Sequence, residues 1–131
     1  MIDELKNIYD QWNKQKLKLE DFNDFIEITT PFVDMHHDYI HLFLTKENDG
    51  KFLISDDGHT VSELSILGVD VNATKKRKNF FNTTLNVFGV SYDNQTEELF
   101  VTVDDIDDYP KKQHNFIQCF SRVSDMLLTS K

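Results

Sequence analysis

The sequence predicts an α+β fold in which an antiparallel sheet of about five strands packs against roughly three or four helices. The first observation behind this prediction is a hairpin pattern, in which strand candidates 38–45 and 51–56 flank a turn containing Asp49-Gly50. Glycine adopts the positive φ of such a turn at little cost. The second observation is another pair of short alternating segments, 90–92 and 99–103. With no regular alternation of strands and helices, two hairpins favour antiparallel pairing.

The remaining strand is predicted over residues 24–30, where apolar and polar side chains alternate. We expect Pro31 to end this strand because proline has no amide hydrogen for the ladder. A short helix follows the third strand, since Thr60 and Glu63 have the spacing of a capping box. The whole order then reads helix, three strands, two helices, two strands and a final helix.

Three longer helices are predicted from apolar residues that recur every three or four positions. The first covers residues 3–16. The second opens at Asn72 or Thr74 and ends at Gly89, because glycine commonly terminates a helix. The last begins near Pro110, a residue that the first helical turn tolerates.

The composition indicates one domain over residues 1–131. The chain has 131 residues, of which 39% are hydrophobic, enough for a core of its own. The single cysteine, Cys119, cannot form an internal disulfide, and the N-terminus has no apolar segment of signal-peptide length. No apolar run is long enough to cross a membrane. We therefore expect a cytoplasmic protein without a membrane span.

Charge is distributed unevenly. The net charge of −9 repels phosphate, so direct nucleic-acid binding is disfavoured. One acidic segment without Lys or Arg contains Asp93, Glu97, Glu98, Asp104, Asp105, Asp107 and Asp108. The basic cluster is Lys75, Lys76, Arg77 and Lys78. Such runs are either solvated faces or recognition patches, and both interpretations stay open.

A second group of carboxylates could carry chemistry: Glu27, Asp34, Asp56 and Asp57, with histidines nearby in the sequence. Carboxylates at strand ends can hold Mg²⁺ or Mn²⁺, and a metal held in this way activates water against a phosphodiester. The alternative is structural, because Asp-Asp-Gly is ordinary turn chemistry and Glu27 shares a face with Thr29. With one cysteine and no suitable histidine spacing, a Cys/His zinc site is disfavoured.

Three segments carry a family resemblance: residues 26–34 (IEITTPFVD), 52–60 (FLISDDGHT) and the stretch from Arg77-Lys78 to 85–90 (LNVFGV). In this order they resemble a small bacterial family of unknown function, over roughly residues 20–128. The resemblance implies a protein of lactobacilli, staphylococci or their prophages and mobile elements. Some members carry a second domain, and we expect this chain to end after the first. The resemblance implies no activity.

The leading hypothesis is a non-catalytic interaction domain whose acidic segment docks on a basic protein partner, such as a nucleic-acid-handling host protein. It requires no cofactor. The alternative is a metal-dependent nuclease or phosphodiesterase that uses the four carboxylates with Mg²⁺ or Mn²⁺. A third hypothesis is a small-ligand sensor that binds an anion through His59 and the basic cluster of residues 75–78.

Overall fold

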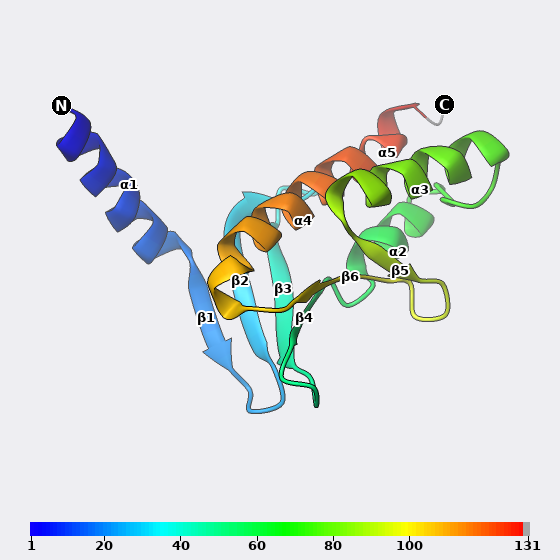
Figure 1. Cartoon of the computed structure of the whole chain (residues 1–131). Coiled ribbons are helices and arrows are strands. Elements are labelled where there is room, and N and C mark those ends of the chain that lie inside the picture. The colour runs from blue at the N-terminus through cyan, green and yellow to red at the C-terminus, as the bar shows by residue number, and fades with distance from the viewer. Residues whose placement is uncertain (130–131) are drawn as a thin grey trace.

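The computed structural model describes residues 1–129 and has the predicted α+β architecture. Six strands form one sheet, in the order β1-β2-β3-β4-β6-β5, and every neighbouring pair is antiparallel (Figure 1). The strands are β1 (Lys18–Asp21), β2 (Ile26–Val33), β3 (Tyr39–Lys46), β4 (Phe52–Ser55), β5 (Ser91–Asp93) and β6 (Glu98–Val103). Both predicted hairpins are present: β3 with β4, and β5 with β6.

The sheet has one strand more than predicted. β1 lies at the edge beside β2, with Lys18 opposite Thr29 and Asp21 opposite Ile26. All four of its residues are exposed. Because neither face of this strand is buried, its sequence needs no alternation of apolar and polar residues, and none is present. The strand conformation of β1 therefore depends on its hydrogen-bonded pairing with β2 rather than on its own sequence pattern.

The helices are α1 (Ile2–Lys16), α2 (His59–Ile66), α3 (Lys75–Phe88), α4 (Tyr109–Ser124) and α5 (Met126–Thr129), with a 3-10 turn at Ile106–Asp108. α4 contacts α2, α3 and β6, and these helices cover one face of the sheet (Figure 1). α1 instead projects from the edge at β1. Within residues 1–129, no helix combines the length and apolarity that crossing a bilayer needs.

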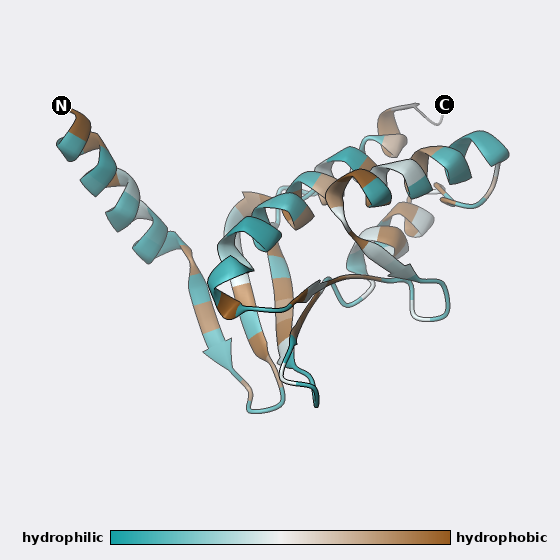
Figure 2. Cartoon of the chain, in the orientation of Figure 1, coloured by the Kyte–Doolittle hydropathy of each residue, from teal (hydrophilic) through white to brown (hydrophobic). Residues whose placement is uncertain are grey.

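The core lies between the helices and one face of the sheet. Along β3, the buried residues Ile40, Leu42 and Leu44 alternate with more exposed ones, as expected for a strand with one face covered. Figure 2 shows apolar residues along the strands and on parts of the helices above them. The helices contribute side chains that include Leu64, Phe81, Phe116 and Phe120.

Two local predictions are wrong: the end of β2 and the N-terminal cap of α2. β2 does not end at Pro31, because it runs to Val33 through a register shift against β3. Such irregular positions accept proline, since they require no ladder hydrogen bond from it. The predicted capping box is absent, because the N-cap of α2 is Gly58 and Asp56, not a threonine hydroxyl, receives an amide of the first turn.

Candidate functional site

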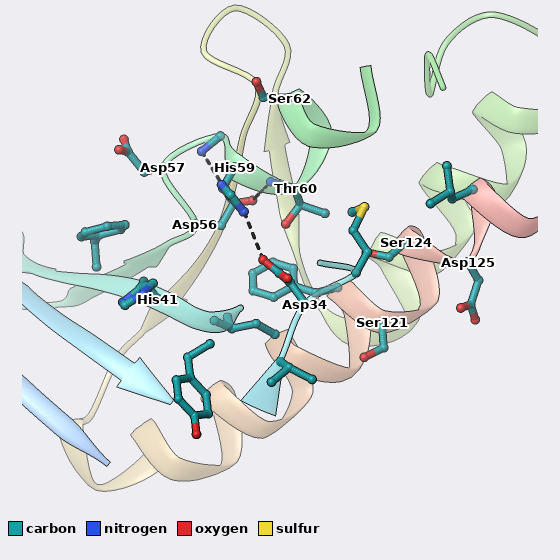
Figure 3. A pocket seen from close by; sticks show the side chains of 18 of the residues that line it. Asp34, His41, Asp56, Asp57, His59, Thr60, Ser62, Ser121, Ser124 and Asp125 are labelled. Atoms are coloured by element: carbon teal, nitrogen blue, oxygen red, sulfur yellow. Dashed lines mark hydrogen bonds and ion pairs between the residues drawn. The ribbon is translucent and has the colours of Figure 1, made fainter. Parts of the chain in front are cut away.

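The four carboxylates predicted from the sequence line one cavity of about 740 Å³: Glu27, Asp34, Asp56 and Asp57. The cavity lies where the turn after β2, the turn between β4 and α2, and the end of α4 approach one another. Figure 3 shows Asp34 and His59 facing each other, with His41 to one side and Ser121, Ser124 and Asp125 to the other. Segments far apart in the sequence therefore meet here.

Asp56 is a structural carboxylate. Its Oδ1 accepts the backbone N–H groups of Gly58 and Leu99, at 2.9 and 3.0 Å, and its Oδ2 accepts that of Thr60 at 3.0 Å. Burial raises the pKa of Asp56, although these backbone hydrogen bonds act in the opposite direction. With both oxygens engaged and the residue buried, Asp56 holds the turn rather than a ligand.

Asp34 organises the turn between β2 and β3 and meets α2. Its Oδ1 accepts the backbone N–H groups of His36 and Asp38, at 2.8 and 3.1 Å. Its Oδ2 lies 3.4 Å from Nε2 of His59, the first residue of α2. Partial burial alone would raise the pKa of Asp34, but the two N–H donors and His59 together lower it. Asp34 therefore stays ionised in the cavity.

A second carboxylate–histidine pair lies on the neighbouring strands. Oε1 of Glu27 on β2 is 3.1 Å from Nδ1 of His41 on β3, and the same nitrogen is 3.0 Å from Oγ1 of Thr29. The pair forms across the open face of the sheet, where these positions alternate with buried ones. Glu27 therefore does share a face with Thr29, as predicted.

Asp57 has a side chain that makes no hydrogen bond or ion pair with the described residues. It is exposed and adopts a left-handed backbone conformation, φ +57°, directly before Gly58 at φ +79°. A Cβ added at Gly58 would lie 2.9 Å from the backbone oxygen of Thr96, so this position requires glycine. The tight turn presents Asp57 at the cavity.

The cavity is acidic as a whole. Its wall contains Asp125 besides the four predicted carboxylates, together with two histidines, His41 and His59. No Lys or Arg of the described residues lines it. Apolar side chains form much of the remaining wall: Val33, Met35, Ile40, Phe43, Phe120, Leu127 and Leu128. This combination suits a ligand that has a cationic head and an apolar stem.

Several potential metal ligands of the cavity already have partners within the protein. Over residues 1–129, no three His, Cys, Asp or Glu side chains are grouped as metal ligands. Asp56 is fully engaged with backbone N–H groups, and Glu27 and Asp34 each face a histidine.

The predicted acidic segment does not form one continuous edge, which corrects the assumption that its side chains lie together. Asp93, Glu97 and Glu98 lie at the β5–β6 turn, whereas Asp104, Asp105, Asp107 and Asp108 follow the opposite end of β6 (Figure 1). The length of β6 separates the groups.

Four members of that segment have partners within the protein. Oδ1 of Asp93 and Oδ1 of Asp105 accept backbone N–H groups of their own turns. Oε2 of Glu98 accepts the Ser55 hydroxyl at 2.6 Å, and Oδ1 of Asp104 lies 3.4 Å from Nζ of Lys51. The basic cluster is separate again. Lys75–Lys78 begin α3, where the Thr74 hydroxyl accepts the N–H of Arg77, and none of the four lines the cavity that contains His59. The two halves of the predicted anion site do not meet.

The contribution of α4 and α5 to the cavity was not predicted from the sequence. Ser121, Ser124 and Asp125 line the cavity together with apolar residues of the same helices. In the sequence, these residues belong to the polar positions of an amphipathic helix and have no distinguishing pattern. Only the packing of α4 against the sheet places them beside Asp34.

The family model described as "Domain of unknown function DUF1828" matches residues 30–123. The match covers most of the chain and includes Asp34, Asp56, Asp57 and His59. It begins after Glu27 and ends before Asp125. Comparison with curated proteins and with solved structures found no match.

Proposed function

The chain belongs to the DUF1828 family, and we propose that it is a non-catalytic binding domain whose acidic cavity receives a basic side chain of a protein partner. The observation that carries this proposal is the wall of the cavity, which combines five carboxylates with apolar side chains and, among the described residues, no Lys or Arg. A cationic group gains attraction there, whereas a phosphate is repelled.

Asp57 is the best placed carboxylate to meet an incoming Arg or Lys. Its side chain is exposed and has no partner within the described part of the chain, so binding breaks no existing contact. Asp34 supplies a second negative charge that its backbone donors keep ionised. The stem of the basic side chain can pack on Met35 and Phe120. Proteins that handle nucleic acids are one source of such side chains, because their phosphate-binding surfaces are rich in Arg and Lys.

The test is titration with a fluorescently labelled peptide of alternating Arg and Gly, followed by anisotropy. We expect Asp57→Asn to weaken binding at least about tenfold, because a charge-assisted hydrogen bond contributes about 1.5–3 kcal/mol. The matched control is Asp107→Asn, which removes the same charge outside the cavity. It should change affinity by less than about twofold.

Equal losses in both variants would favour the acidic segment of residues 93–108 over the cavity. A wild-type protein that binds the Arg peptide no better than a Gln-Gly peptide of equal length would contradict the proposal. Binding should also weaken between about 50 and 200 mM salt, because the attraction depends on exposed charges.

A second candidate is the metal-dependent phosphodiesterase, because all four carboxylates predicted for it line the same cavity. Holding Mg²⁺ or Mn²⁺ there requires Glu27 and Asp34 to leave their histidines. Thermal unfolding with millimolar Mg²⁺ or Mn²⁺ tests it, since a ligand of the native state raises the melting temperature. Under the leading proposal neither metal shifts the melting temperature. A clear shift that Asp34→Asn abolishes, with cleavage of DNA or RNA, would establish the second candidate instead.

A further inference from the structure

α1 (Ile2–Lys16) carries an apolar face that no other segment of residues 1–129 covers. Leu5, Ile8 and Trp12 recur every three or four residues and therefore lie on one side of the helix. All three are exposed, as are Ile2 and Tyr9 beside them. None of the α1 side chains is buried, and Figure 1 shows the helix standing apart from the rest of the fold.

A helix of this kind needs a covering surface. α1 has 15 residues, a length at which an isolated helix is only marginally stable in water. Helices in proteins are stabilised mainly by packing an amphipathic face, but α1 approaches the rest of the described chain at β2 without burying any of its side chains. An exposed row of large apolar side chains also marks an interaction surface.

The charges of α1 indicate what covers it. The first turn is acidic, with Asp3 and Glu4, and the last turn is basic, with Lys14 and Lys16. At about 3.6 residues per turn, Glu4 and Lys16 lie beside the apolar face, whereas Asp3 and Lys14 lie on the opposite side of the helix. Two antiparallel copies would place Glu4 of one copy beside Lys16 of the other, whereas two parallel copies would place like charges together. We propose that α1 pairs antiparallel with α1 of a second copy of this chain, so that their apolar faces cover each other. Such a contact is two-fold symmetric and closes as a dimer.

Other occupants fit less well. Helices that lie on membranes are rich in Lys and Arg on their polar face. α1 balances its basic residues with acidic ones, so its polar face offers anionic lipids little attraction. The small area of the α1–α1 contact limits the affinity of the proposed dimer. A helix of 15 residues is about 22 Å long, and a single pair buries less than a standard interface, so the dimer should dissociate in the micromolar range.

Trp12 is the only tryptophan of the chain and lies on the proposed contact, so it reports dimerisation directly. Between about 1 and 300 µM, we expect sedimentation to show the mass rise from one chain to two, with a blue shift of tryptophan emission. Leu5→Glu combined with Ile8→Glu should weaken the dimer by about a hundredfold or more. The matched control is Ile66→Glu, which places the same charge on an exposed isoleucine of α2 and should leave the dimer intact.

Charge exchange tests the antiparallel arrangement. Glu4→Lys should weaken self-association, as should Lys16→Glu, because each change places like charges together at the contact. Mixing the two variants should restore association, because each altered turn then meets an opposite charge. A wild-type protein that stays monomeric up to about 300 µM would overturn the proposal, as would self-association that neither charge variant weakens. Vesicle binding of the monomer that shifts Trp12 emission would point to a membrane instead.

Discussion

Asp34 links two segments of the chain through one carboxylate. It accepts N–H groups of its own turn on one oxygen and faces His59 of α2 with the other. Ionisation of Asp34 therefore supports both the turn and its contact with α2. The lowered pKa of this group makes that support dependent on pH.

Because the pKa of Asp34 is lower in the folded protein, its ionised form stabilises the fold above the unfolded-state pKa of about 4. That stabilisation is lost as the pH falls through the folded pKa. We expect Asp34→Asn to be less stable than the wild type at pH 7, with the difference in unfolding free energy shrinking below about pH 4. Urea unfolding at several pH values between 7 and 3 measures it. A difference that is constant over this range would contradict the assignment, and Asp107→Asn serves as the control.

Individual residues were predictable where their chemistry is local. Cys119 is the single cysteine noted in the sequence, and it is a free thiol, buried, with a pKa raised to about 12 by burial and by the charge of Asp56. The sequence was compatible with two roles for Asp56, a metal ligand or a residue that stabilises a turn. The hydrogen bond from the backbone N–H of Leu99 on β6 indicates the structural role. No local sequence pattern predicts this contact, because the two residues lie far apart in the chain.

Asp56 also joins three elements. It follows β4, receives the amide of Thr60 in the first turn of α2, and receives the amide of Leu99 on β6. These contacts fix the angle at which α2 leaves the sheet, and with it the position of His59 in the cavity.

Asp56→Asn should lower the unfolding free energy by about 2–3 kcal/mol. The asparagine keeps one acceptor oxygen but turns an NH₂ group toward a buried backbone donor, which loses its partner. The midpoint of urea unfolding measures the loss. The neighbouring change, Asp57→Asn, is the control, because asparagine tolerates the left-handed conformation and the side chain is exposed, so the effect should stay within about 0.5 kcal/mol. Equal stability of both variants would show that Asp56 does not hold the turn.

Helices and hairpins were predicted closely because their patterns are short-range. The long helices end within a few residues of their predicted bounds, and Thr74 and Gly89 flank α3 as expected. β1 was missed because an exposed edge strand needs no apolar alternation. The extension of β2 past Pro31 was missed because a bulge depends on the partner strand.

The whole chain is acidic, but its surface does not act as one negative field. The carboxylates of residues 93–108 divide between the two ends of β6, and the length of that strand keeps them apart. The cavity instead gathers acidic groups from β2, the α2 turn and the end of α4. This is why the proposed basic partner is assigned to the cavity, although the longest acidic segment lies elsewhere.

The order of the amino acids was sufficient for the fold class, both hairpins, the long helices and the choice of Glu27, Asp34, Asp56 and Asp57 as a group of interest. These features depend on periodicity and turn chemistry, which act over a few residues. The strand order, the division of the acidic segment, the role of Asp56 and the contribution of Asp125 were decided by tertiary structure. They depend on contacts between residues far apart in the chain, and such contacts form only when α4 packs on the assembled sheet.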